Sequence, residues 1–262
     1  NVMLRRHDLC SCFTSQVRAM TRHRIPVLMR RAARPFVRKW VQHRRRRHVF
    51  FGSFRRTTPI DAHWGFNRGK PVDRYYIEKY LDANRDAITG AVLEIASPRY
   101  TESFGQNVTA IDVLMVSEGN PEATIIADLT DAPQIPDDQF DCAVVTQTIQ
   151  FIQDYRAALA TLQRILKPGG ALLITSPCVT KLSPGEDHEW GQWWHPTARA
   201  LELELSRVFG AGNVEVTAYG NVLSATSFLW GLATQDLRVA ELDHKDPAYE
   251  VIVAARAKKA ST

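Results

Sequence analysis

Three acidic residues lie at or near the ends of apolar runs that have the character of buried strands. Glu94 is near the end of the first run, Asp112 ends the second, and Asp128 ends the third. Asp112 comes 18 residues after Glu94, close to the ~20-residue spacing expected of an acid that binds ribose hydroxyls. Because open α/β sheets bind ligands outside the carboxyl ends of their strands, three such acids indicate a nucleoside site, in which Asp128 would accept a hydrogen bond from an exocyclic amine. Each acid alone is also explained as a helix cap or a turn residue.

The turn after the first apolar run is the expected position of a cofactor-binding loop. Glycines there let the backbone approach a ligand closely, but this sequence has Ala96, Ser97 and Pro98, and the next glycine is Gly105. Three interpretations stay open: a working cofactor site, a degenerate fold that serves as a binding module or a partner of another enzyme, or another reaction on the same scaffold.

A second group of reactive side chains lies in residues 187–196, after the fifth apolar run. His195 and His188 titrate near neutral pH, and Asp187 could act as a base or orient a histidine, so these three are the candidate catalytic residues. Aromatic faces with polar edges suit sugar rings, and the candidate sugar-binding residues are Trp190, Trp193 and Trp194. The alternative is a lid whose tryptophans only pack over the core. The histidines lack further well-spaced ligands, so we expect no metal.

A polar cluster precedes the first predicted helix of the main domain. Arg68 and Arg74 could clamp a carboxylate or a phosphate, and Tyr75 could close over it, which makes these three candidate substrate-binding residues. The alternative is a turn with surface arginines.

The charge is divided along the chain. The 262 residues carry a formal net charge of +5, from 33 Lys and Arg and 28 Asp and Glu. Residues 1–56 hold 16 of the bases and one acid, which leaves 17 bases and 27 acids for residues 57–262. We therefore predict a basic, partly helical arm or linker over 1–56 and an α/β domain over 57–262. We expect such an arm to bind an anionic membrane surface or another acidic partner, and we expect no specific nucleic-acid site.

Alternating strands and helices would position these residues. Apolar runs predict strands at 91–96, 108–113, 123–129, 140–148, 171–175, 213–218 and 250–257. Helical spacing predicts helices over 72–88 and 155–166 and another that begins at Thr197. Continuous apolar runs indicate strands buried on both faces, hence a doubly wound, mostly parallel, seven-stranded α/β sheet. No apolar run has the length of a membrane span, and four scattered cysteines favour a reducing, cytoplasmic setting.

Several of these segments together resemble class I S-adenosylmethionine-dependent methyltransferases. The stretches that carry the resemblance are Val92-Leu-Glu-Ile, Ala127-Asp-Leu, Phe140-Asp at a strand start, and Arg164-Ile-Leu-Lys-Pro-Gly-Gly before Ala-Leu-Leu-Ile-Thr. The chain also resembles the subgroup found beside glycosyltransferases in bacterial polysaccharide clusters. That resemblance rests on residues 64–76, on Thr146-Gln147 and on residues 190–194.

The resemblance implies a Rossmann-like sheet whose last strand is antiparallel, with S-adenosylmethionine as cofactor. It also implies O-methylation of a sugar or glycan intermediate in polysaccharide biosynthesis. The implied cofactor-binding residues are Glu94 and Ala96 at the methionine part with Ser97 beside them, Asp112 at the ribose, Asp128 and Leu129 at the adenine, and Thr146 and Gln147 at the pocket floor.

Overall fold

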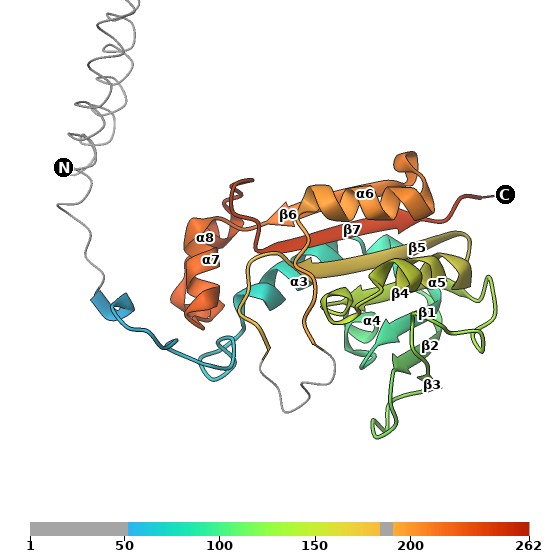
Figure 1. Ribbon diagram of the computed structural model, residues 1–262, viewed down its shortest axis with the longest axis horizontal. Coiled ribbons are helices and arrows are strands. Elements are labelled where there is room, and N and C mark those ends of the chain that lie inside the picture. The colour runs from blue at the N-terminus through green and yellow to red at the C-terminus, as the bar shows by residue number, and fades with distance from the viewer. Residues whose placement is uncertain (1–51, 184–190, 262) are drawn as a thin grey trace, which may run out of the picture. The chain divides into compact units, whose positions relative to one another are not determined.

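The computed structural model describes residues 52–183 and 191–261 (Figure 1). The chain divides into two compact units, Asn1–Arg56 and Thr57–Thr262, which are treated separately. In the first unit the described part consists of the short 3₁₀-helix η1 (Gly52–Phe54) and two arginines, so the predicted basic arm lies almost entirely outside the described residues. Three candidate site residues also lie outside them: Asp187, His188 and Trp190.

Within the described residues, one seven-stranded sheet has the order β3-β2-β1-β4-β5-β7-β6. Strand β7 is antiparallel to β5 and to β6, and the pairs formed among β1 to β5 are parallel, as the resemblance implied. The strands are β1 (Gly90–Ile95), β2 (Val108–Met115), β3 (Ile125–Ile126), β4 (Phe140–Thr146), β5 (Leu166–Pro177), β6 (Val214–Tyr219) and β7 (Ile252–Lys258). The prediction of a mostly parallel seven-stranded α/β fold is therefore confirmed.

Two apolar layers cover the sheet. Leu93 of β1 packs into the layer formed with α5 (Tyr155–Ile165) and α6 (Ala198–Phe209). Its neighbour Val92 packs into the opposite layer, because successive side chains of a strand point to opposite faces. That second layer contains residues of α3 (Val72–Ala83), α4 (Arg99–Phe104), α7 (Val222–Leu229) and α8 (Val239–Asp243) (Figure 1).

The helix boundaries follow from capping residues in the sequence. The Asp154 carboxylate accepts a hydrogen bond from Ala157 N at the start of α5, and Thr197 Oγ1 accepts from Ala200 N at the predicted start of α6. Helix α5 ends at Ile165, and β5 begins immediately and runs through Lys167-Pro-Gly-Gly. The proline cannot continue the helix because it lacks a backbone N–H.

Several predicted boundaries are wrong, among them the start of β5, which lies at Leu166 and not at residue 171. The helix expected over 72–88 ends at Ala83, where the Asn84 side chain donates to Tyr80 O, and a 3₁₀ turn, η2 (Arg85–Ala87), follows. Strand β2 continues to Met115, and β3 has two residues instead of seven. Strands β2 and β3 pair only through Leu114↔Ile125 and Met115↔Ile126. Strand β2 therefore ends later, and β3 is shorter, than the apolar runs indicated.

No helix in the described part of the chain is long and apolar enough to cross a membrane.

Candidate functional site

The carboxyl ends of β1 to β5 meet at one edge of the sheet because these strands are parallel, and most of the described candidate cofactor residues lie along it. Glu94, at the end of β1, is only 2% exposed. Its two carboxylate oxygens accept the backbone N–H groups of Tyr100 (3.0 Å) and Thr101 (2.7 Å), in the first turn of α4. Burial raises the pKa of Glu94, and the hydrogen bonds from Thr101 and Tyr100 oppose that rise. Glu94 therefore orders the turn that follows β1.

Ala96 gives this turn the backbone conformation of a glycine. Its φ is +72°, in the left-handed region, and the residue is exposed. Ala96 N donates to Leu114 O (3.1 Å), and Ala96 O accepts from the Asn120 side chain (2.6 Å). The loop between β1 and α4, the first loop, thus keeps a glycine-like path although the sequence has no glycine there, with half-buried Ser97 next and Pro98 at the start of α4.

Asp112 does not end its strand, so its predicted place at the carboxyl edge is wrong. It pairs with Leu93 inside the sheet, and Val113, Leu114 and Met115 continue β2 beyond it. Its carboxylate accepts a hydrogen bond from the Thr124 hydroxyl (2.8 Å). The apolar residues Val113, Leu114 and Met115 are compatible with a longer strand, but the pairing of Leu114 and Met115 with β3 decides where β2 ends.

The residue that follows the true end of β2 is different. Glu118, three positions after Met115, is exposed in the turn that reaches Ala96 O through Asn120. Glu118 was not among the predicted site residues. The turn composition of Ser117-Glu-Gly-Asn120, with Gly119 at φ +115°, is the signal that could have indicated it. Glu118 is the first carboxylate after the end of β2, and it is exposed.

Asp128 and Leu129 follow β3 but present different groups. Asp128 is exposed, and its Oδ1 accepts from Thr130 N (2.8 Å) in a tight turn. Leu129 is 4% exposed and packs its side chain into the core. A base at this edge could therefore meet the Asp128 side chain and the Leu129 backbone, but not the Leu129 side chain.

The floor after β4 carries unpaired amide groups. Thr146 ends β4, and Gln147 has φ +52° with its N–H donating to Thr175 O (3.0 Å). Gln147 Oε1 accepts from Gln150 Nε2 (3.2 Å). Gln147 Nε2 and Gln150 Oε1 are buried and have no hydrogen-bond partner among the described residues. One donor and one acceptor are therefore available at this floor, as a polar ligand requires.

The lid segment is attached to that floor. The N–H groups of Trp193 (2.7 Å) and Trp194 (3.4 Å) point at Gln150 O. The Trp194 indole also donates to Ile152 O (3.0 Å) and Gln153 O (3.1 Å), so Trp194 is anchored, in agreement with the packing alternative. Trp193 is 51% exposed and is the described tryptophan of the lid that is best placed to stack on a ligand.

His195 is held by a specific hydrogen bond in the lid. Its Nε2 lies 2.6 Å from Gln192 Nε2, and Gln192 Oε1 accepts from Ser183 N (2.8 Å). Burial lowers the pKa of His195, which favours the neutral imidazole. The candidate base is thus in the protonation state that can accept a proton.

The three polar residues predicted as one cluster lie in different places. Arg68 forms a two-bond ion pair with Asp236 (2.6 and 2.9 Å), and the Tyr75 hydroxyl donates to Asp243 (2.7 Å). Burial and that aspartate raise the pKa of Tyr75 to about 12. Arg74 instead contacts α4, where its Nη1 donates to the Tyr100 hydroxyl (2.6 Å). The prediction of one cluster was wrong: Arg68 lies before α3, and Arg74 and Tyr75, adjacent in α3, point about 100° apart.

One N–H donor of the Arg74 guanidinium is not used. Its Nε is buried and has no hydrogen-bond partner within the described part of the molecule. The neighbouring Asp73 is 9% exposed and accepts from Arg74 N (2.8 Å). An anionic group beside the first loop would complete the hydrogen bonding of this guanidinium.

Lys181 is a cation near the end of β5 that was not among the predicted site residues. It lies four residues after the end of β5, donates to Ala62 O (2.6 Å) and places Nζ 3.4 Å from the centre of the Trp64 ring. Burial lowers its pKa. The described residues contain no group of three or more His, Cys, Asp or Glu side chains that could hold a metal ion.

Residues 89–174 match the family model described as a methyltransferase domain. The match begins one residue before β1 and ends inside β5, so it covers β1 to β4 and all but the last three residues of β5.

Solved structures of low sequence identity resemble the chain. A methyltransferase dependent on S-adenosylmethionine from Mesorhizobium loti is 17% identical, with 72% of this chain and 98% of that chain covered and a TM-score of 0.45. Another from Archaeoglobus fulgidus is 14% identical, with 76% and 100% covered and a TM-score of 0.47. The [4+2]-cyclase SpnF is 18% identical, with 71% and 81% covered and a TM-score of 0.46. No curated protein sequence matches this chain.

Proposed function

We propose that this protein is an S-adenosylmethionine-dependent O-methyltransferase that acts on a sugar or glycan intermediate. The observation that carries the proposal is the methyltransferase-domain match, because it falls on β1 to β5, whose carboxyl ends hold the polar groups described above. The sugar acceptor is supported by the exposed indole of Trp193 beside His195.

The polar groups of this edge fit the proposed cofactor, which supplies an electrophilic methyl group when bound. Arg74 would pair with the carboxylate of its methionine part through the unpartnered Nε. Glu118 would accept from the ribose hydroxyls and Asp128 from the adenine amine, while Gln147 Nε2 and Gln150 Oε1 would bind polar atoms above the floor. Glu94 would act indirectly, by ordering the loop through α4.

His195 would act as the base. The hydroxyl oxygen of the acceptor would bond to the methyl carbon while the bond from that carbon to the cofactor sulfur breaks, its electron pair staying on the sulfur of the departing S-adenosylhomocysteine. The hydroxyl proton would pass to Nε2 of His195, the atom that faces Gln192 Nε2 in this structure. Because burial favours neutral His195, the imidazole is ready to take that proton near neutral pH. Trp193 would hold the sugar ring so that the hydroxyl stays near the base.

A second candidate function is a binding module that no longer holds the cofactor. It is favoured by one observation: a non-glycine residue, Ala96, occupies the left-handed position of the first loop, and its methyl group narrows the space for a close ligand. The two candidates differ in whether the cofactor binds.

Calorimetry with S-adenosylhomocysteine separates them. We expect 1:1 binding at micromolar concentration, weakened at least tenfold by Arg74→Lys or Gln147→Ala, whereas Glu202→Gln on the exposed face of α6 should bind as the parent does. Absence of heat at several temperatures would support the binding module. Transfer of a labelled methyl group to a panel of reducing sugars and glycan fragments then tests the acceptor class.

A further inference from the structure

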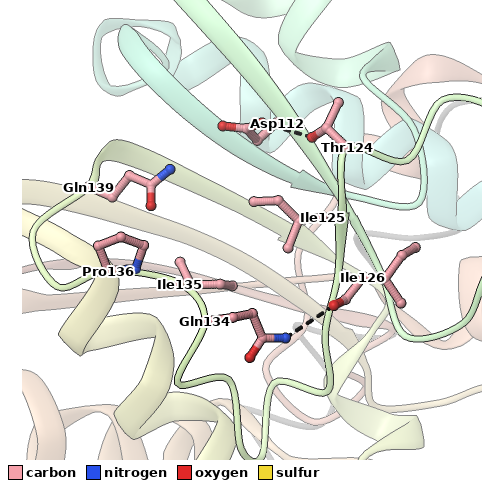
Figure 2. A pocket seen from close by; sticks show the side chains of 8 residues that line it. All are labelled: Asp112, Thr124, Ile125, Ile126, Gln134, Ile135, Pro136 and Gln139. Atoms are coloured by element: carbon pink, nitrogen blue, oxygen red, sulfur yellow. Dashed lines mark hydrogen bonds between the residues drawn. The ribbon is translucent and has the colours of Figure 1, made fainter.

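A pocket lies at the edge of the sheet beside β3 (Figure 2). Its volume is about 460 Å³, within the usual range for small-molecule sites. The residues that line it come from β2, from β3 and from the segment before β4: Asp112, Thr124, Ile125, Ile126, Gln134, Ile135, Pro136 and Gln139. None of these side chains has a role in the methyl transfer proposed above.

The strand register separates this pocket from the carboxyl edge. Strand β3 begins opposite Leu114, so Asp112 lies two residues before the start of β3 in the strand direction. Gln139 directly precedes β4, whose opposite end carries Thr146 and Gln147. Asp112 and Gln139 of this pocket therefore lie before the carboxyl ends of β2 and β4, whereas the proposed cofactor residues Glu118 and Gln147 follow those ends.

The polar groups of the pocket mainly accept hydrogen bonds. Asp112 has one oxygen bonded to the Thr124 hydroxyl, and its other oxygen has no hydrogen bond among the described residues. Gln139 Oε1 is buried without a partner. Gln134 uses its Nε2 to donate to Ile126 O (3.1 Å), which leaves its own Oε1 as the acceptor (Figure 2).

The negative charge of Asp112 is also unbalanced at this corner. The described residues give Asp112 no ion pair, although two bases lie on neighbouring segments. Arg164 is occupied by Asp137 and by two backbone carbonyls, and Lys259 is occupied by Asp138. The walls between the acceptors are apolar, from Ile125, Ile135 and Pro136.

We propose that this pocket binds a compact primary amine in its ammonium form. An ammonium group has three donors and no acceptor, which matches the Asp112 carboxylate and the free amide oxygens. The hydrocarbon part of the ligand would pack on the isoleucine walls. A neutral alcohol offers one donor and no charge, so it satisfies fewer of these groups.

The test uses cyclohexylamine, which is protonated at neutral pH, and cyclohexanol as a probe of the same shape without charge. Amide chemical shifts of the isotope-labelled chain are followed during titration with each probe. We expect cyclohexylamine to move the signals of residues 124–126 and 134–139, and to bind about tenfold or more tightly than cyclohexanol, the scale of one hydrogen bond to a charged group.

Two variants test the recognition chemistry. Asp112→Asn keeps an oxygen for the Thr124 hydroxyl but removes the charge, and we expect it to weaken cyclohexylamine at least tenfold. Gln139→Ala removes one acceptor and should weaken it less. Glu118→Gln neutralises the other carboxylate near β2, at the opposite edge, and should leave the affinity unchanged. Equal binding of cyclohexanol, shifts confined to the carboxyl edge, or unchanged affinity of a folded Asp112→Asn would each overturn the proposal.

Discussion

Gln192 determines which nitrogen of His195 carries the proton. Ser183 N donates to Gln192 Oε1, so the amide nitrogen of Gln192 is the atom that faces His195 Nε2 at 2.6 Å. An amide nitrogen can only donate, and His195 Nε2 must therefore accept and leave the ring proton on Nδ1. The lone pair needed by a general base is thus present at Nε2, where an acceptor hydroxyl could replace the amide of Gln192.

His195→Gln should lower turnover by roughly 100- to 10,000-fold, the usual contribution of a general base. Binding of S-adenosylhomocysteine should change little, because the proposed cofactor groups belong to other segments. The measurement is single-turnover methyl transfer beside calorimetry. His244→Gln, which changes an exposed histidine of another segment, is the control and should retain activity. Full activity of His195→Gln would remove His195 as the base.

The pH dependence of the reaction should follow the lowered pKa of His195. Neutral His195 is the active form, so kcat/KM should rise with pH through that pKa and level off above it. Gln192→Glu puts a carboxylate beside the ring, which stabilises the imidazolium and raises its pKa. The rising limb should therefore move to higher pH in this variant, whereas Gln192→Ala should lower activity without such a shift. A limb that stays in place in Gln192→Glu would show that His195 is not the titrating group.

Ala96→Gly should stabilise the domain. The left-handed conformation costs a non-glycine residue about 1–2 kcal/mol, and glycine loses about 0.5–1 kcal/mol more than alanine in chain entropy on folding. The balance predicts an increase of about 0.5–1 kcal/mol in the free energy of unfolding, measured with urea. Ala96→Val should lower it, because a branched side chain fits this conformation worse than alanine. A loss of stability in Ala96→Gly would mean that the Ala96 methyl group makes a contact more favourable than the strain.

The sequence allowed prediction of the sheet but not of how its edges end. Seven strands followed from continuous apolar runs, and the start of α6 followed from Thr197, because burial and capping leave local signals. The place of Asp112 did not follow, since the pairing of Leu114 and Met115 with β3 decides where β2 ends. Ala96 likewise adopts a glycine-like conformation only because Leu114 O and Asn120 bind its backbone from another strand and loop.

Hydrogen bonds between residues far apart in the sequence could not be predicted either. Arg68 and Tyr75 looked like ligands for an anion, yet they bind Asp236 and Asp243, 168 residues later in each case. Nothing in the spacing of residues 65–75 indicates those partners. Arg74 contacts Tyr100 because of its position on α3. The residue type alone does not indicate that contact.

The basic segment supplies the last prediction. Residues 1–56 hold 16 Lys and Arg and one acid, and basic residues near an anionic lipid surface contribute about 1 kcal/mol each at moderate salt. We therefore propose that the full chain binds vesicles rich in phosphatidylglycerol and that binding falls as salt shortens the Debye length to about 3 Å at 1 M. Removing residues 1–51 should abolish this binding, and Arg44 to Arg47 all changed to Gln should weaken it in part. The unfolding midpoint should change little on that removal, because the described residues of both apolar layers belong to residues 57–262. If vesicle binding survives the removal of residues 1–51, the contact belongs to the domain. If the full chain does not bind vesicles even at low salt, a membrane is not the partner of the basic segment.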